Sequence, residues 1–235
     1  MEMKDWKKKG ITDFLCKNPD MKFVSLTSTQ AVLEGVYHLS AHHSIGGNVD
    51  YNYELRIEIP ATFPKAIPIV REISNKIPRD DHHHVSRDII NYTDNLCLGS
   101  RIRILQKINE NPTISGFIEK CVVPFLYANT SDDFLFGELE HGWDGILDDY
   151  KEIFSVSTDE QVLKILLCIS KKKRIANKQL CPCGCKQRLG KCNLHNKINE
   201  TRYLASRNSF KAEYNNIVKA RKFETLKNFG SIRTV

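Results

Sequence analysis

Residues 51–59 alternate strictly between apolar and polar side chains, and this segment places the strongest constraint on the fold of the 235-residue chain. Apolar or aromatic residues occupy every second position, at Tyr51, Tyr53, Leu55, Ile57 and Ile59. A period of two is typical of a β-strand that buries one face and leaves the other in solvent. Pro60, Pro64 and Pro68 follow and remove backbone donors, so we expect the chain to continue as an extended connection along a sheet edge.

Runs rich in β-branched and aromatic residues predict the neighbouring strands of an antiparallel meander. They cover residues 23–28, 31–40 and 67–73, and the glycines within residues 44–48 indicate a hairpin loop before the Tyr51 strand. Combined with the helices predicted below, these strands indicate an α+β fold.

Helical periodicity marks the rest of the chain. Residues 4–17 predict a short helix that ends at Asn18-Pro19. A second helix is predicted after Pro112, with Pro124 expected to kink it or end it near Lys120. Its apolar stripe comprises Ile114, Phe117, Ile118, Cys121, Val122 and Phe125. Three more helices are predicted from their apolar faces. The first face comprises Trp143, Ile146, Leu147 and Tyr150, and the second, which follows a capping box of Ser157 and Glu160, comprises Val162, Ile165, Leu166 and Ile169. The third lies within residues 203–229 and comprises Phe210, Tyr214, Ile217 and Val218.

A single cysteine, Cys97, lies between two pairs of turn-forming residues, Asp94-Asn95 and Gly99-Ser100. A lone cysteine is more often a buried small residue than a nucleophile. The turn residues on both sides instead favour an irregular segment on which the thiol can be reached. The run His82 to His84 precedes this cysteine, and Arg101 to Ile104 alternate briefly after it.

Taken in order, these segments resemble the ubiquitin-conjugating enzymes. The matching residues are Tyr53 to Pro60, Phe63-Pro64, Pro68 to Val70, His82 to His84 and Cys97-Leu98-Gly99. Residues 137–142, Gly-Glu-Leu-Glu-His-Gly, are similar to bacterial relatives of these enzymes in CBASS antiphage operons, which contain a cGAS-like nucleotidyltransferase. The resemblance covers residues 23–155, although the family's His-Pro-Asn motif is replaced by three histidines set farther from the cysteine.

The resemblance implies an antiparallel meander flanked by helices and a transferase that carries an acyl group as a thioester on Cys97. It implies that the carried group is the C terminus of the neighbouring nucleotidyltransferase, which is then passed to an amine of unknown identity. Acyl transfer develops an oxyanion, for which His84 is the first candidate hydrogen-bond donor and His82 the second. The chain has no glycine-rich nucleotide loop, so either a separate activating enzyme supplies the thioester or the protein works without one.

Three other functions use overlapping residues. A metal-dependent hydrolase would take its ligands from Asp80 to His84, because carboxylates and imidazoles suit Zn²⁺ or Mn²⁺. A cysteine hydrolase would use Cys97 with His141 as base and Asp144 or Glu140 as the orienting carboxylate. A conjugating-fold adaptor without catalysis would tolerate loss of the Cys97 thiol.

Soft metal ligands crowd into residues 181–195. Their order, Cys-Pro-Cys-Gly-Cys followed by Cys192 and His195, resembles the short zinc knuckle of the SEC-C type. Four ligands complete a tetrahedral Zn²⁺ site, and we assign them to Cys181, Cys183, Cys192 and His195, with Cys185 as a substitute ligand. The zinc would have a structural role, because so small a segment folds only when metal binding supplies the free energy.

Charge divides the chain unequally. Residues 171–235 hold 17 Lys and Arg against three Glu, a net charge of +14, whereas the remainder carries −7. We therefore predict a conjugating-like catalytic domain, residues 1–175, and a basic tail, residues 176–235, that contains the zinc knuckle and a helix. Nucleic acid or an acidic protein is the expected partner of the tail, with a solvated basic helix as the alternative. The zinc knuckle could bind nucleic acid or dock the nucleotidyltransferase, and the apolar stripe within residues 203–229 favours protein docking.

We expect a cytoplasmic protein without membrane contact. No apolar run reaches the roughly 20 residues needed to cross a bilayer, and Met1 to Trp6 lack the apolar core of a secretory signal. Scattered single cysteines are also typical of a reducing compartment. These are Cys16, Cys97, Cys121 and Cys168.

Overall fold

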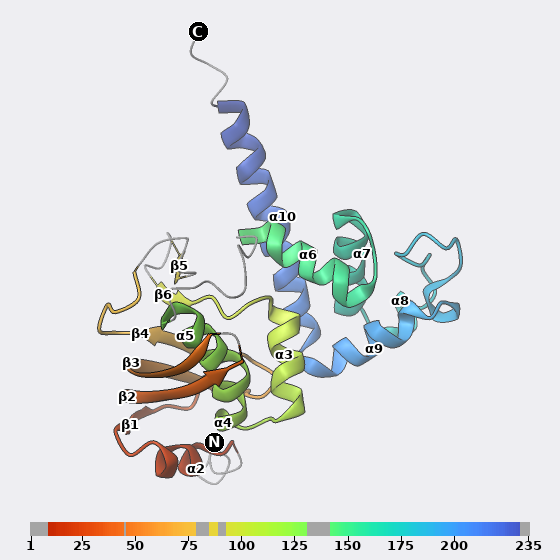
Figure 1. Ribbon diagram of the computed structural model, residues 1–235. Coiled ribbons are helices and arrows are strands. Elements are labelled where there is room, and N and C mark those ends of the chain that lie inside the picture. The colour runs from red at the N-terminus through yellow and green to blue at the C-terminus, as the bar shows by residue number, and fades with distance from the viewer. Residues whose placement is uncertain (1–8, 45, 79–84, 89–92, 131–141, 231–235) are drawn as a thin grey trace. The chain divides into compact units, whose positions relative to one another are not determined.

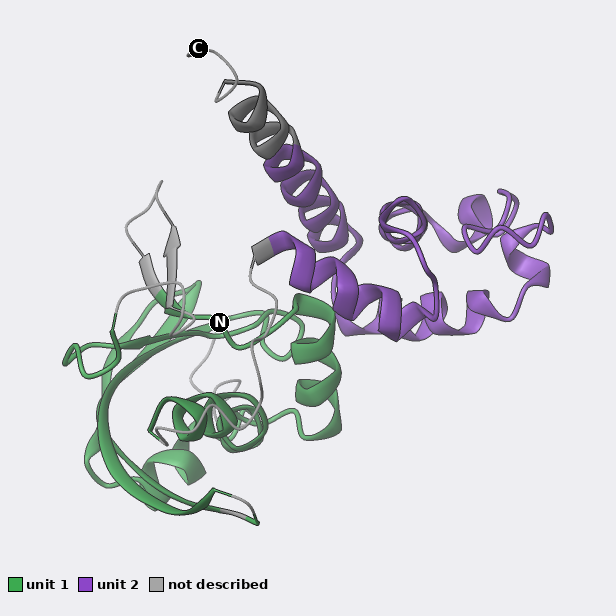
Figure 2. Ribbon diagram, turned by 45° about the horizontal axis from the view of Figure 1, so that its top comes forward, with its two compact units in different colours: residues 1–139 green, residues 140–235 purple. Residues whose placement is uncertain are grey.

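The computed structural model describes residues 9–44, 46–78, 85–88, 93–130 and 142–230. The chain forms two compact units, residues 1–139 and residues 140–235 (Figure 2). Each unit has its own buried apolar residues, and each is described separately.

An antiparallel sheet is the framework of the first unit. Over the described residues its six strands are β1 (Met21–Leu26), β2 (Gln30–His43), β3 (Gly47–Pro60), β4 (Ile69–Glu72), β5 (Val85–Asp88) and β6 (Thr93–Leu96). Their order is β1-β2-β3-β4-β6-β5, and every neighbouring pair is antiparallel. The predicted α+β class and the meander of four strands are confirmed, whereas the hairpin of β5 and β6 has no counterpart in the prediction.

The alternation in β3 separates a buried face from a charged face. The apolar residues on its core side are buried, namely Tyr53, Leu55, Ile57 and Ile59. Tyr51, predicted on the same face, is instead exposed. On the opposite face Arg56 Nη1 lies 2.6 Å from Glu34 Oε2 of β2, and Arg56 Nε lies 3.2 Å from Glu58 Oε1. Arg71 Nη1 of β4 lies 2.5 Å from the same Glu58 oxygen, so ion pairs connect three adjacent strands.

A continuous helical segment packs on the core face of the sheet (Figure 1). It consists of α4 (Ile114–Phe117), η1 (Ile118–Val122) and α5 (Val123–Thr130), and the predicted stripe faces the core. In η1, a π-helical turn, the N–H of Val123 donates to the carbonyl of Ile118. Pro124 has no N–H for the helical hydrogen bond to Lys120. The hydrogen bonding changes at this point from the α-helical to the π-helical spacing, and the helix therefore continues past Lys120 to Thr130.

Two further helices complete the first unit, α2 (Ile11–Lys17) and α3 (Arg101–Glu110). Residues 11–17 confirm the C-terminal half of the helix predicted over residues 4–17, whereas residues 9 and 10 form a turn, with Gly10 at a positive φ of 73°, and residues 4–8 lie outside the described ranges. The brief alternation of residues 101–104 lies in the first turn of α3, where Ser100 Oγ accepts a hydrogen bond from the Arg103 N–H at 3.4 Å. Leu105 and Ile108 are buried together with Ile102 and Ile104, which is a helical pattern.

The described part of the second unit is helical. Its elements are α6 (Gly142–Phe154), α7 (Asp159–Ser170), α8 (Lys173–Ala176), η2 (Leu189–Lys191), α9 (Leu194–Leu204) and α10 (Arg207–Gly230). The stripe predicted for α7 is fully buried, at Val162, Ile165, Leu166 and Ile169. The capping box lies one residue later than predicted, because Thr158 and Gln161 form it in place of Ser157 and Glu160. The helix predicted over residues 203–229 is interrupted between Leu204 and Arg207.

The two compact units divide at residues 139 and 140, whereas the change of charge along the sequence predicts a boundary at residues 175 and 176. The difference arises because α7 packs against α6, α9 and α10. Tyr150 Oη of α6 also donates to Glu213 Oε1 of α10 at 2.9 Å, and Lys197 Nζ of α9 donates to the Ile153 carbonyl at 3.1 Å. The change of net charge therefore occurs inside the second unit.

None of the helices in the described ranges combines the length and the apolar character needed to cross a bilayer.

A histidine on β2 offers a pH-dependent test of the packing around β3. His38 Nε2 lies 2.6 Å from Asp20 Oδ2, and His38 Nδ1 lies 2.6 Å from Asn52 Oδ1. The hydrogen bond to Asp20 is the largest cause of a raised pKa of His38, and the one to Asn52 is the second. The folded state thus favours the protonated form of His38. The stabilisation that this proton gives to the fold is complete below the ordinary histidine pKa of about 6.5 and is lost as the pH rises through the raised pKa.

We expect an NMR titration of His38 to give a midpoint above about 6.5, and Asp20→Asn to lower it. Asp50→Asn is the matched control, because Asp50 raises the pKa of His38 only through a weaker charge effect. Equal midpoints in the wild type and in Asp20→Asn would contradict the described contact.

Candidate functional site

Cys97 is exposed on the short irregular segment between β6 and α3. Leu96 and Ser100 are buried, so both ends of this segment are anchored in the first unit. Gly99 has a φ of +114°, which favours glycine although a Cβ there would meet no atom within 4 Å. The prediction of an irregular, reachable segment around the thiol is therefore confirmed.

All but one of the side chains predicted to assist this thiol or to bind a hydrolytic metal lie outside the described residues. They are His82 and His84, and for the hydrolase alternatives Asp80, Asp81, His83, Glu140 and His141. Asp144 is described, in the first turn of α6, where it is exposed and belongs to the second unit. The oxyanion roles of His84 and His82 and both hydrolase sites therefore stay predictions.

Four thiols come together in the second unit. The sulfur atoms of Cys181, Cys183, Cys185 and Cys192 all lie within 4.8 Å of one another. Cys183 Sγ is 3.2 Å from Cys181 Sγ and 3.6 Å from Cys192 Sγ. Four sulfurs in a tetrahedron around Zn²⁺, each about 2.3 Å from the metal, lie about 3.8 Å from one another. The cluster is therefore compatible with a tetrahedral zinc site.

Cys185 is the fourth member of this cluster, a position predicted for His195 with Cys185 as the substitute. His195 Nδ1 instead lies 2.8 Å from the Cys192 carbonyl oxygen, and its ring is not part of the cluster. Gly184 and Lys186 have positive φ values of 84° and 61° and bend the chain on both sides of Cys185. This backbone conformation brings the third thiol of the Cys-Pro-Cys-Gly-Cys run to the others.

The cysteine loop, residues 181–192, is held by a backbone hydrogen bond within it and by two to the residues that precede it. The Cys181 N–H donates to the Gln187 carbonyl at 2.8 Å, and the Leu189 N–H donates to the Gln179 carbonyl at 2.8 Å. The Gly190 N–H donates to the Asn177 carbonyl at 3.1 Å, where a Cβ on residue 190 would lie 3.1 Å from Asn177 Cβ. Glycine therefore permits the close approach of the two segments.

Gln161 connects the cysteine loop to α7. Its Nε2 donates to the Cys183 carbonyl at 3.1 Å, while its Oε1 accepts from the N–H groups of Ser157 at 3.0 Å and Thr158 at 3.1 Å. One side chain thus caps the helix and orients the backbone beside a thiol of the cluster. Such outer contacts fix the geometry of metal ligands.

The thiols of the cluster differ in their electrostatic surroundings. Burial raises the pKa of the Cys181 thiol and that of the Cys183 thiol. The backbone N–H of Gln187 instead lowers the pKa of the Cys185 thiol. Zn²⁺ binds thiolates, so metal binding releases protons and weakens as the pH falls.

Comparisons with protein-family models, with curated proteins and with solved structures give no match to this chain.

Proposed function

We propose that this protein is a ubiquitin-conjugating-like acyltransferase that carries a protein C terminus as a thioester on Cys97. The observation that carries the proposal is the exposed thiol on a short segment between a strand and a helix cap. A thiolate is a strong nucleophile even when it is a minor species at neutral pH. The antiparallel meander, which holds β6 through β4, supports the same assignment.

Two displacements make up the reaction. Cys97 thiolate attacks the carbonyl carbon of an incoming thioester; a new carbon–sulfur bond forms, the old one breaks, and the donor thiol leaves as a thiolate. An acceptor amine then attacks the Cys97 thioester, an amide bond forms, and the Cys97 thiolate is restored while the amine loses its proton to solvent or a base. His84, with His82 second, would stabilise the oxyanion of each step by hydrogen bonding.

The partners follow from the motif resemblance. The carried group is the C terminus of a cGAS-like nucleotidyltransferase, and the setting is antiphage defence of the CBASS kind in the bacterial cytoplasm. This assignment rests on residues 137–142 and on the ordered motifs before Cys97.

The metal has a structural role in this proposal. Cys181, Cys183, Cys185 and Cys192 would hold Zn²⁺ with all four positions filled by protein thiolates. A closed site of this kind leaves no position for a substrate or a reactive water, so the zinc stabilises the cysteine loop.

The decisive experiment is co-expression with the nucleotidyltransferase of the operon, and with the operon's activating enzyme where it encodes one, followed by non-reducing electrophoresis and mass spectrometry. We expect the wild type to carry an adduct on Cys97 that thiols release. In Cys97→Ser we expect an ester that resists thiols and is cleaved by hydroxide. Cys16→Ser, which removes another exposed single thiol, is the control and should carry the wild-type adduct.

The absence of an adduct from both the wild type and Cys97→Ser, in protein that is folded, would contradict acyl transfer and favour the adaptor. Loss of the loaded group to water without an amide product would favour the cysteine hydrolase.

A further inference from the structure

The sequence between Glu160 and Glu200 contains ten Lys and Arg and no Asp or Glu. Three of these cations have partners: Lys164 pairs with Glu160 at 2.7 Å, and Lys171 and Lys197 donate to neutral oxygens. The other seven form no ion pair with any described carboxylate, and all seven are exposed. We define them as the basic surface: Lys172, Lys173, Arg174, Lys178, Lys186, Arg188 and Lys191.

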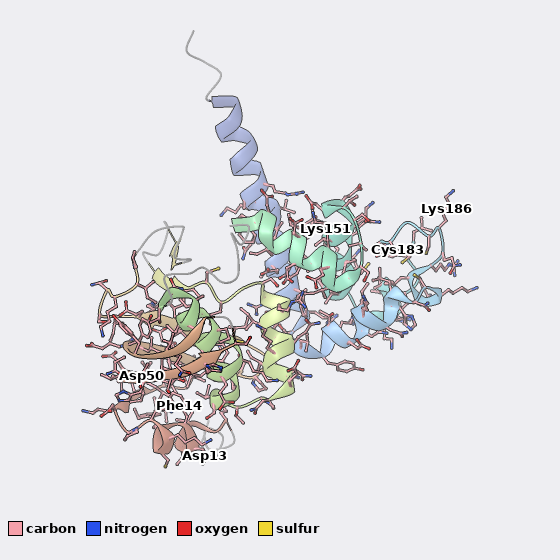
Figure 3. All side chains as sticks on the ribbon, viewed as in Figure 1. Asp13, Phe14, Asp50, Lys151, Cys183 and Lys186 are labelled. Atoms are coloured by element: carbon pink, nitrogen blue, oxygen red, sulfur yellow. The ribbon has the colours of Figure 1, made fainter. Side chains whose placement is uncertain are left out.

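The fold of the cysteine loop brings these seven cations together from two segments of the chain. The segment with the first four cations, residues 172–178, adjoins the segment with the other three, residues 186–191. Leu180 and Arg188 form a β-bridge, and the N–H groups of Leu189 and Gly190 donate to the carbonyls of Gln179 and Asn177. Figure 3 shows Lys186 and Cys183 on this loop. The two segments are therefore fixed to each other, and the thiol cluster fixes the loop between them.

We propose that the basic surface binds the phosphate backbone of a nucleic-acid duplex without reading the base sequence. One Zn²⁺ with four thiolates has a formal charge of −2, so the seven cations leave the surface with a net charge of +5. Lys and Arg on such a surface replace the counterions of the phosphates, and the release of those counterions favours binding.

The composition of the surface favours nucleic acid over an acidic protein. Five of its seven cations are Lys, a residue that is depleted at protein–protein interfaces, where aromatic residues and Met are enriched. The exposed apolar residues beside it are Ile175 and Leu180. They are isolated aliphatic side chains and do not provide the aromatic anchors typical of a protein interface.

The same composition indicates contact with phosphates rather than with bases. The two segments that carry the basic surface, residues 172–178 and 186–191, contain no Phe, Trp or Tyr on which an unpaired base could stack, and the exposed Tyr203 of α9 lies outside them. A duplex presents more phosphate charge per unit length than a single strand does. Double-stranded nucleic acid is therefore the expected ligand, with an affinity of roughly 10⁻⁴ to 10⁻⁶ M at physiological salt.

The test uses the full zinc-loaded chain and a fluorescent duplex of about 30 base pairs of mixed sequence, with anisotropy measured between about 50 and about 200 mM salt. The variant is Lys186→Gln, Arg188→Gln and Lys191→Gln together. The control is Lys17→Gln, Lys22→Gln and Lys65→Gln, which removes the same charge from exposed positions of the first unit. Zinc content, measured for each protein, shows that the cysteine loop is intact.

We expect the variant to bind at least about 100-fold more weakly at 100 mM salt, with a salt slope smaller by about 3, while the control binds like the wild type. The proposal is overturned if the zinc-loaded wild type shows no salt-dependent binding, or if variant and control lose affinity equally. It is also overturned if phosphatidylserine vesicles or polyglutamate, and not the duplex, bind the wild type and lose binding in the variant.

Discussion

Chelation of zinc from the full-length protein is expected to unfold the cysteine loop and to leave the sheet of the first unit folded. Structural zinc sites contribute about 10 to 16 kcal/mol of apparent binding free energy, which is more than a segment of this size gains from packing. Besides Cys181 and Pro182, Leu189 is the buried apolar side chain of this loop. Hydrogen exchange measured by mass spectrometry should show lost protection in residues 181–192 and unchanged protection in β3.

Single substitutions identify the fourth ligand in the same experiment. With Co²⁺ in place of zinc, Cys185→Ser should remove about a quarter of the thiolate-to-metal charge-transfer absorption, because one of four thiolates is lost. His195→Ala should leave that absorption unchanged, and Cys16→Ser controls for general effects of losing an exposed thiol. A changed metal spectrum in His195→Ala together with a wild-type spectrum in Cys185→Ser would return the fourth position to His195.

Replacing Glu72 by alanine is expected to destabilise the first unit by about 3 kcal/mol. The Glu72 carboxylate is buried at the end of β4, with 1% of the residue exposed. Its Oε1 accepts hydrogen bonds from the Ser74 N–H at 2.9 Å and from the Ser74 hydroxyl, and its Oε2 accepts from the Lys76 N–H at 3.1 Å. The substitution leaves these donors without their acceptor, and hydrogen exchange in β3 and β4 should accelerate by about 100-fold.

Glu54→Ala provides the matched control for Glu72→Ala, because Glu54 is an exposed carboxylate on the neighbouring strand β3. Its effect should stay within about 0.5 kcal/mol. Glu72→Gln, which keeps one acceptor oxygen, should fall between the two. Equal exchange rates in Glu72→Ala and Glu54→Ala would show that the buried carboxylate does not stabilise the turn after β4.

The strands of the meander could be predicted because burial on one face imposes a period of two over many residues. Tyr53 to Ile59 satisfy that period at every position. The four residues from Arg101 to Ile104 also alternate, but so short a run fits the first turn of a helix equally well. The hydrogen bond from the Arg103 N–H to Ser100 Oγ decides between the two, and sequence spacing does not reveal it.

The metal cluster could be predicted from ligand spacing, but its fourth member could not. Cysteine and histidine are both good zinc ligands, so composition does not distinguish Cys185 from His195. The distinction depends on the backbone at Lys186, whose positive φ is uncommon for a residue with a Cβ. The structure supplies that conformation, and with it the position of the Cys185 thiol.

The change of net charge predicts a boundary at residues 175 and 176, because charged residues are distributed according to solvent exposure. Packing follows the buried apolar stripe of α7 instead, and α7 contacts α9 and α10, beyond the charge change, as well as α6 before it. The charge change just after α7 and the packing of α7 thus indicate different boundaries. The packing decides, because buried apolar area determines which residues fold together.

Gln161 limits which sequences can preserve both the start of α7 and the cysteine loop. Glutamate and glutamine are interchangeable in an ordinary capping box, since either supplies the acceptor oxygen. Here the same side chain must also donate to the Cys183 carbonyl, which a carboxylate does not do. Homologous chains that keep the cysteine loop should therefore retain glutamine at this position, whereas chains that have lost the loop should be free to exchange it for glutamate.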